Sequence, residues 1–269
     1  MMKISSWNQY LSSNNPWSDR LLGLKKFSIK RDLEQVEREY DQEKYGSIVE
    51  FEFNNIELYR TKELENYGLT EKDNTFISLS EEIFETNISL AWSIYSSIIS
   101  SFVKRYNPSR ICELGCGYGY NFSYLKNICS EVYGGEYSTN AMKIANRLGL
   151  EVQNFNYYNL EDYQIIKAGS SILTIHSIEQ IQSAKYFIDG IYQLSKNIDF
   201  IFNFEPCFLN NRNSWIGTLR NRYIEINHYN KDLINILKSR NDIEIIEYHP
   251  DYIGINPLHP TSVIIWRFK

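Results

Sequence analysis

Apolar residues recur at every third or fourth position between residues 86 and 106, a period that predicts an amphipathic helix. The repeat is carried by Ile88, Ala91, Trp92, Tyr95, Ile98, Ile99, Phe102 and Val103. Thr86 or Asn87 is placed to cap the start of this helix, and the Asn-Pro pair at 107–108 ends it. The helix marks the start of the regularly patterned part of the chain.

Beyond this helix, short apolar runs that predict strands alternate with amphipathic runs that predict helices. The strand runs lie at 110–114, 131–136, 151–155, 171–175, 199–204, 243–248 and 262–268. The helix runs lie at 121–128, 138–149 and 183–196, and a long helical stretch begins near 215. This alternation predicts an α/β fold, with a sheet of seven mostly parallel strands covered by helices on both faces. We expect this domain to span residues 86–269.

Residues 1–85 are more polar and predict an N-terminal helical extension. A charged helix is expected over 29–45, stopped by Gly46, and a short hairpin is expected over 48–60. The extension either covers one edge of the core domain or forms a lid over a substrate pocket.

A helical insertion is expected at about 207–229. It carries Arg212, Arg220 and Arg222, which could pair with an anionic acceptor. We favour the other interpretation, in which these arginines lie on a solvated helix face.

Charge and composition narrow the function. The net charge is −5, the pI is about 5.5 and no block of Lys and Arg dominates any segment, which argues against nucleic acid as a partner. No run of about 18 apolar residues occurs, so no membrane span or membrane partner is expected. The chain begins without the apolar core of a signal peptide, and its cysteines form no CxxC pair. We therefore expect a cytoplasmic protein with reduced thiols at Cys112, Cys116, Cys129 and Cys207. The oligomeric state is not predicted.

Residues 111–122 read ICELGCGYGYNF and place three glycines on alternate positions between a strand and a helix. Because glycine has no side chain, the backbone can turn tightly here and a ligand can contact the main chain. The helix that follows points its free N–H groups into the same space. In open α/β sheets, ligands bind beyond the carboxyl ends of the strands. The spacing differs from the dinucleotide pattern GxGxxG, because Tyr120 stands where its third glycine would be.

The segment ELGCGYG resembles motif I of the class I S-adenosylmethionine-dependent methyltransferases. An acidic residue, Glu113, precedes the three alternating glycines in a strand–helix context. The resemblance covers residues 86–269 and is motif-specific at 111–137. It implies a Rossmann-like fold, S-adenosyl-L-methionine as the cofactor and methyl transfer as the activity.

A second carboxylate supports this resemblance. Glu136 ends the next predicted strand, where an acidic side chain can accept hydrogen bonds from both ribose hydroxyls of a nucleoside, and in the family this carboxylate does so. The third strand ends near Asn156 and Tyr157, which the resemblance places beside the adenine. The implied cofactor-binding residues are Glu113, Gly115, Cys116, Gly117, Gly119, Glu136, Tyr137, Asn156, Tyr157 and His176.

The ends of the fourth and fifth strands carry the candidate catalytic residues, His176 and Glu205. An imidazole whose pKa is near neutrality can take the acceptor's proton, although a hydrogen-bonded structural histidine fits this position equally well. Glu205 is expected across the same opening. A divalent metal ion is not expected, but His176, Glu179 and Glu205 resemble the metal-binding variant of some family members, and their atoms suit such an ion.

We therefore expect an S-adenosylmethionine-dependent methyltransferase that acts on an oxygen, before a nitrogen, of a small polar acceptor such as a sugar or a surface-glycan building block. Two other functions stay open. One is a NAD-dependent oxidoreductase, which Tyr120 disfavours. The other is a non-catalytic protein that binds the cofactor as part of a complex with a second protein. A spermidine-synthase-like aminopropyl transfer is disfavoured, because the glycine turn lacks an acidic run.

Overall fold

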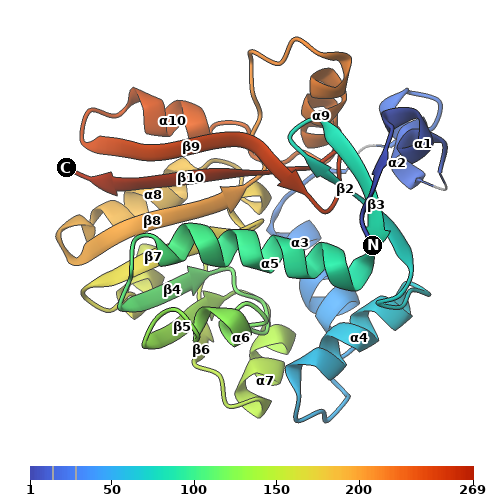
Figure 1. The fold of residues 1–269 in the computed structure, drawn as a ribbon. Coiled ribbons are helices and arrows are strands. Elements are labelled where there is room, and N and C mark those ends of the chain that lie inside the picture. Colours follow the sequence, from blue (N-terminus) through green and yellow to red (C-terminus); the bar gives the residue numbers. More distant parts are fainter. Residues whose placement is uncertain (14, 28) are drawn as a thin grey trace.

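One twisted β-sheet runs through the computed structural model, which describes residues 1–13, 15–27 and 29–269 (Figure 1). Within these residues the strand order is β1-β3-β2-β9-β10-β8-β7-β4-β5-β6. The strands are β1 (Lys3–Ser5), β2 (Asn74–Leu79), β3 (Glu82–Asn87), β4 (Arg110–Leu114), β5 (Glu131–Glu136), β6 (Val152–Asn154), β7 (Ser170–Ile175), β8 (Ile198–Glu205), β9 (Ile243–Gly254) and β10 (Thr261–Phe268). The α-helices are α1 (Trp7–Ser12), α2 (Pro16–Leu21), α3 (Leu33–Val36), α4 (Ile56–Asn66), α5 (Ile88–Lys104), α6 (Phe122–Leu125), α7 (Thr139–Arg147), α8 (Lys185–Tyr192), α9 (Trp215–Ile226) and α10 (Leu233–Ser239). One π-helix, η1 (Glu37–Tyr45), and the 3-10 turns η2 (Leu160–Ile165), η3 (Ile178–Gln180) and η4 (Ser195–Asn197) complete the set in the described residues.

Five neighbouring strands, β6, β5, β4, β7 and β8, are parallel. β10 runs antiparallel to β8, and β9 runs antiparallel to β10. The prediction of seven mostly parallel strands is wrong in its count, because β2, β3 and β1 continue the same sheet beyond β9. The N-terminal region is therefore not only helical, since it adds three antiparallel strands to the described sheet.

The two faces of the sheet bury separate cores because successive side chains of a strand point in opposite directions. Ile111 and Ile265 pack with α5, α6 and α7 on one face. Their chain neighbours Cys112 and Ile264 pack with α8 and α10 on the other. The expected cover of helices on both faces is confirmed, with α5 in front of the sheet and α8 behind it in Figure 1.

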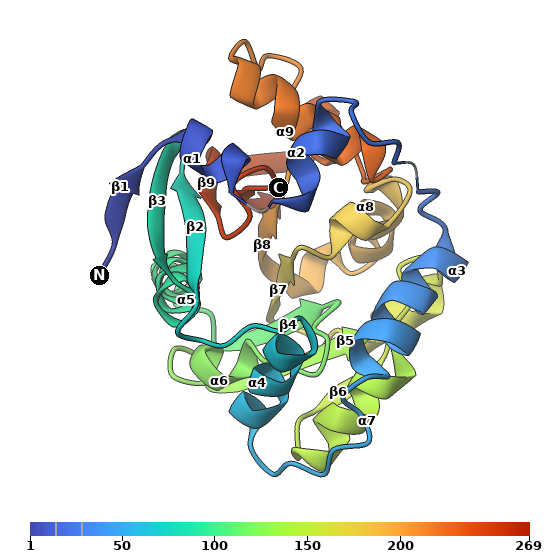
Figure 2. The ribbon, with the colours of Figure 1, turned by 90° about the vertical axis from the view of Figure 1, so that its right-hand side faces the viewer.

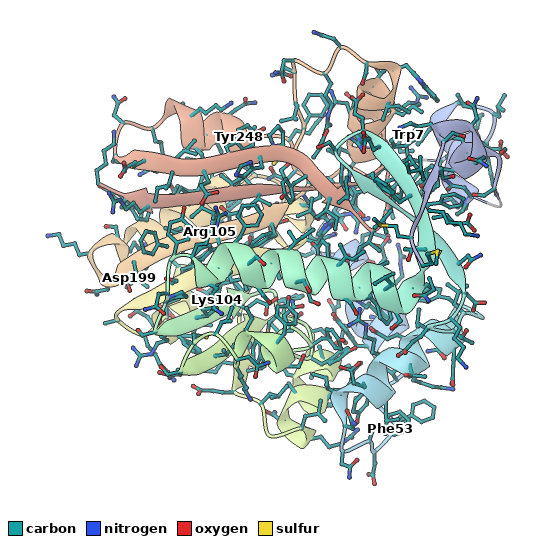
Figure 3. The ribbon with its side chains drawn as sticks, in the orientation of Figure 1. Trp7, Phe53, Lys104, Arg105, Asp199 and Tyr248 are labelled. Carbon is teal, nitrogen blue, oxygen red and sulfur yellow. The ribbon has the colours of Figure 1, made fainter. Side chains whose placement is uncertain are left out.

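The helix predicted over 86–106 is confirmed as α5. The Asn87 side chain caps it by accepting a hydrogen bond from the N–H of Leu90 at 2.8 Å. The apolar stripe of α5 packs on the sheet, where the Phe102 ring lies 6.2 Å from that of Phe204 in β8. Just after α5, Arg105 donates to Glu247 of β9 at 2.9 Å (Arg105 is labelled in Figure 3).

The hairpin predicted over 48–60 is wrong, since α4 takes up its second half. The carbonyl oxygens of Val49 and Phe51 accept hydrogen bonds from the Arg147 guanidinium at 2.7 and 2.6 Å, which occupies groups that a strand partner would need. A hairpin does form in the N-terminal region, but as β2 and β3, which bury Ile77 and Ile83.

The charged helix predicted over 29–45 is present as α3 followed by η1, and it ends before Gly46. Asp32 caps α3 by accepting a hydrogen bond from the N–H of Gln35 at 3.1 Å. Figure 2 shows α3 and the helical turns that follow it, in blue, beside the yellow-green α7. No helix in the described part of the chain is long and apolar enough to cross a membrane.

The arginines of the segment at 207–229 do not form the solvated face that we favoured. Arg212 and Arg220 are buried and both pair with Asp251 of β9, with Arg220 at 3.2 Å, whereas Arg222 is exposed. The partly buried carboxylate of Asp251 compensates these charges. The two guanidinium groups therefore attach α9 and the segment just before it to the sheet.

Candidate active site

A cavity of about 420 Å³ opens at the carboxyl ends of β4, β5 and β7. Its wall includes Gly117 of the glycine turn, Glu136 at the end of β5 and His176 after β7. The N-terminal region supplies further wall residues, among them Tyr45 of η1 and Arg60 of α4. This volume lies in the range of about 300–1,000 Å³ that is typical of small-molecule sites. The predicted ligand site therefore exists as a cavity.

The glycine turn is built from left-handed backbone. Gly115, Gly117 and Gly119 have φ values of 73°, 56° and 81°, a region that suits glycine. A Cβ on Gly115 would lie 1.8 Å from the Ser177 hydroxyl, and a Cβ on Gly117 would lie 2.5 Å from the Tyr45 hydroxyl. Gly115 and Gly117 line the cavity, whereas Gly119 faces Leu150 and Phe122 away from it.

Glu136 is fixed by the turn that it faces. Its carboxylate accepts hydrogen bonds from the N–H of Gly117 at 2.7 Å and from the N–H of Ser138 at 2.8 Å. Burial raises the pKa of this carboxyl despite these bonds. Each oxygen accepts one bond from the backbone and keeps a lone pair, so the group can still accept from a ligand in the cavity.

Glu113 lies at the base of the same cavity. One carboxylate oxygen accepts a hydrogen bond from the Asn121 side chain at 2.6 Å, and the other is buried without a partner among the described residues. Burial raises the pKa of Glu113 to about 8, and the charge of Glu136 adds to the rise. A buried carboxylate oxygen without a donor is suited to a cationic or N–H-bearing ligand group.

Tyr157 and Asn156 follow β6 and join the cavity wall, as do Cys116 and Tyr137. The Tyr157 hydroxyl donates to the carbonyl of Leu114 at 3.0 Å and bonds to the Ser177 hydroxyl at 2.8 Å. It thereby ties the ends of β4 and β7 together. Burial raises the pKa of the Cys116 thiol well above its usual range, so this cysteine is a neutral wall residue.

His176 adopts φ 49°, which is unusual for a residue with a side chain and is concentrated at functional sites. Its Nε2 bonds to the Thr261 hydroxyl at 2.7 Å, and its Nδ1 lies 3.4 Å from the Glu179 carboxylate. Burial opposes protonation of the ring, but the charge and hydrogen bond of Glu179 together with the charge of Glu205 outweigh it and raise the pKa of His176. The ring is about one-third exposed and lines the cavity.

Glu205 was predicted as a catalytic residue, but the structure places it behind the cavity wall with 1% exposure. Its carboxylate accepts hydrogen bonds from the N–H of Ser177 at 3.0 and 3.1 Å and from that of Ile178 at 3.1 Å. Burial raises its pKa to about 7, and the charge of Glu179 adds to the rise. Glu205 therefore holds the backbone that carries His176.

Glu179 and His259 form a buried pair behind His176. The Glu179 carboxylate lies 2.6 Å from His259 Nε2 and accepts from the Gln180 side chain at 2.7 Å. Burial opposes ionisation of Glu179, but the two histidines outweigh it and lower its pKa. Burial lowers the pKa of His259 in spite of Glu179. The structure thus brings His176, Glu179 and His259 together, where the sequence suggested Glu205 as the third residue.

The N-terminal region docks beside the Glu136 side of the cavity through Asp41 of η1. Its carboxylate accepts from the Ser138 hydroxyl at 2.6 Å and from the N–H of Asn140 at 2.8 Å, at the start of α7. Tyr45 follows along η1 and contacts Gly117. The cavity is therefore closed on this side by residues that lie far from the glycine turn in the sequence.

Arg60 of α4 is held between two aromatic rings of the cavity wall. Its guanidinium carbon lies 3.1 Å from the Trp92 ring centre and 3.8 Å from that of Tyr120. Sequence reasoning missed Asp41, Tyr45 and Arg60, and no local motif marks them. Asn121, by contrast, directly follows the glycine stretch and could have been proposed as a partner of Glu113.

No protein-family model and no curated protein sequence matches the chain. Among solved structures, the chain is similar to the plantazolicin methyltransferase BpumL in complex with a monoazolic desmethylPZN analog and SAH (S-adenosylhomocysteine), with 17% identity, a TM-score of 0.45 and coverage of 66% of this chain and 84% of that one. It is also similar to the magnesium protoporphyrin IX methyltransferase ChlM of Synechocystis PCC 6803 with SAH, at 12% identity, TM-score 0.47 and coverage of 67% and 84%. A third is the geranyl diphosphate C-methyltransferase of Streptomyces coelicolor A3(2) with Mg²⁺, geranyl diphosphate and SAH, at 11% identity, TM-score 0.46 and coverage of 66% and 80%. With TM-scores of 0.45 to 0.47, these likenesses leave the function to be argued from the residues of the cavity.

Proposed function

We propose that this protein is an S-adenosylmethionine-dependent methyltransferase that transfers a methyl group to an oxygen of a small polar acceptor, such as a sugar hydroxyl. One observation carries the proposal. The bare backbone of Gly115 and Gly117 and the Glu136 carboxylate face one cavity at the carboxyl ends of parallel strands. This is the place where an α/β sheet binds the nucleoside part of a ligand.

The charges of the wall suit the two ends of this donor. Glu136 would accept hydrogen bonds from the ribose hydroxyls, and Asn156 and Tyr157 would flank the adenine. A cationic ligand group beside Glu113 would favour the ionised form of this carboxyl, so Glu113 and Arg60 match the ammonium and carboxylate groups of the methionine part. A carboxyl group and a guanidinium on one wall favour a zwitterionic ligand group over a pyrophosphate, which supports a methyl donor rather than NAD.

The bound donor would supply an activated methyl group on its sulfonium, so the chain has to position the acceptor, exclude water and remove a proton. Positioning of two reactants is worth roughly 7–11 kcal/mol. We assign the removal of the acceptor's proton to His176, because it is the cavity-lining imidazole on the loop held by Glu205. Glu205 is then a positioning residue rather than a catalytic one.

The N-terminal region would serve as a cover for the donor. Its residues Tyr40, Asp41, Lys44 and Tyr45 share the cavity wall with the glycine turn. Asp41 holds this cover to the start of α7 through the bonds to Ser138 and Asn140. Exclusion of water by such a cover strengthens electrostatic contacts within the cavity.

Titration of the purified protein with S-adenosylhomocysteine and with NAD⁺ tests the donor assignment. We expect saturable binding of S-adenosylhomocysteine and no measurable binding of NAD⁺ by isothermal titration calorimetry. Tight binding of NAD⁺ without binding of S-adenosylhomocysteine would contradict the proposal and support the NAD-dependent oxidoreductase. Binding of S-adenosylhomocysteine without turnover on a panel of sugars and other hydroxyl acceptors, together with a stable complex with a second protein, would favour the non-catalytic alternative.

His176→Ala tests the catalytic assignment. We expect unchanged affinity for S-adenosylhomocysteine and turnover lowered by about 10²–10⁴-fold, the usual contribution of a general acid or base. His249→Ala is the matched control, because His249 lies in β9 outside the cavity. Normal turnover of the His176 variant would remove His176 from the mechanism.

A further inference from the structure

Behind His176, one carboxylate lies between two imidazoles. Ligand atoms of His176, Glu179 and His259 all lie within 4.8 Å of one another. Glu179 and His259 are buried, with side-chain exposures of 5% and 7%, whereas His176 reaches the cavity. The three residues come from the loop after β7 and from the segment just before β10, so the fold itself assembles the cluster.

The distances are close to those of a metal centre. In a tetrahedral zinc site with bonds of about 2.1 Å, neighbouring ligand atoms lie about 3.4 Å apart. Glu179 Oε2 and His176 Nδ1 are 3.4 Å apart, which needs no movement. Glu179 Oε2 and His259 Nε2 are 2.6 Å apart and share a hydrogen bond, so an ion would replace that proton and open the pair by roughly 1 Å.

Contacts already orient the three side chains: hydrogen bonds hold His176 and Glu179, as is usual for metal ligands, and packing holds His259, whose Nδ1 has no partner among the described residues. His176 Nε2 bonds to Thr261, which leaves Nδ1 directed at Glu179. The other oxygen of Glu179 accepts from Gln180 at 2.7 Å. The His259 ring packs against the rings of Tyr223 and Tyr229, at centroid distances of 4.7 and 4.9 Å.

We propose that His176, Glu179 and His259 bind a divalent first-row transition-metal ion, for which Zn²⁺ is the probe. Two imidazole nitrogens and one carboxylate oxygen favour such ions over Mg²⁺, which prefers oxygen ligands. Glu205 does not belong to this cluster of ligand atoms, and its carboxylate instead accepts hydrogen bonds from the backbone N–H groups of Ser177 and Ile178.

Three protein ligands leave an open position, as in catalytic zinc sites, and His176 places that position beside the cavity. An ion there would bind the acceptor's oxygen and lower the pKa of its hydroxyl, and His176 would then act as a ligand of the ion in place of the role of base that it has without the ion. This role rests on the proposed function, whereas the binding of the ion does not.

The test is a titration of the chelator-treated full-length chain with Zn²⁺, using calorimetry and competition with a chromogenic chelator. We expect one ion per chain and a higher melting temperature with Zn²⁺. His176→Ala and His259→Gln are each expected to lower the affinity at least tenfold. His249→Ala controls for surface binding, since His249 lies 3.0 Å from Glu247 on exposed β9 and could capture an ion.

Each outcome decides the proposal. Loss of affinity in both cluster variants, with circular dichroism spectra like the wild type, supports it. Equal affinity for Zn²⁺ in the wild type and in His176→Ala overturns the proposal. This variant is expected to fold, because the His176 side chain is partly exposed and its removal leaves the core filled. Loss of binding in His249→Ala instead would assign the ion to the surface pair. Binding of S-adenosylhomocysteine is measured in the same samples, so failure of the metal site and failure of the donor site are distinguished.

Discussion

Replacement of Gly117 by alanine tests the glycine turn and the N-terminal cover together. Gly117 has φ +56°, and a Cβ there would lie 2.5 Å from the Tyr45 hydroxyl. The left-handed conformation costs an L-residue about 1–2 kcal/mol. The contact with Tyr45 adds a second cost, because real Cβ atoms do not approach so closely and either the turn or η1 must move.

Gly149→Ala separates the two costs. Gly149 has a similar φ of +66°, but a Cβ there would meet nothing within 4 Å. We expect this control to lower the melting temperature by about 2–8 °C, the shift that corresponds to about 1–2 kcal/mol in a chain of this size. Its affinity for S-adenosylhomocysteine should not change, since Gly149 lies outside the cavity.

Gly117→Ala should lower the melting temperature further and weaken S-adenosylhomocysteine binding at least tenfold, about 1.4 kcal/mol. Tyr45→Phe added to this variant should recover part of both losses, because the next Tyr45 atom lies 3.4 Å from the added Cβ, at the edge of ordinary contact. Differential scanning calorimetry and isothermal titration calorimetry give the two readouts. If Gly117→Ala and Gly149→Ala behave alike in both, the packing of η1 on the turn has no role in donor binding.

Three further changes test separate parts of the site. Glu136→Gln is expected to weaken S-adenosylhomocysteine binding at least tenfold in calorimetry; an unchanged Kd would remove Glu136 from the donor site. Burial raises the pKa of Glu113 from 4.5 to about 8, so the folded chain keeps a proton that the unfolded chain releases, and stability falls as the pH rises through this window. Glu113→Gln should therefore flatten the fall of the ligand-free melting temperature between pH 5 and 9, and parallel curves for the two proteins would contradict this. Asp41→Ala removes the bonds to Ser138 and Asn140 and should raise both proteolytic cleavage within 33–45 and the dissociation rate of S-adenosylhomocysteine by roughly tenfold; an uncut η1 would argue against a mobile cover.

The parts of the site that could be predicted from sequence are those encoded in one short segment. The strand and the alternating glycines stand within 111–122 and the following helix begins at Phe122, and the tight turn that the sequence predicted is built from left-handed backbone at all three glycines. Glu136 could be predicted because it ends the next strand and parallel neighbours end at the same edge of a sheet. At the glycine segment and at Glu136, the local sequence pattern and the topology of the sheet lead to the same prediction.

The missed parts depend on contacts between distant segments. His259 pairs with Glu179 from the far end of the chain, and Asp41 reaches α7 from the N-terminal region. Neither residue belongs to a motif, so only the fold brings it to the cavity. The three additional strands were missed for a similar reason, because β2 pairs with β9 through only a short register, at Ser78–Gly254 and Leu79–Ile253.

A crystal structure of the protein with S-adenosylhomocysteine tests the central claim most directly. We predict the ribose hydroxyls on the Glu136 carboxylate, the amino-acid end between Glu113 and Arg60, and the sulfur directed at His176. A complex in which the ligand lies outside this cavity, or in which Glu136 does not contact the ribose, would contradict the account.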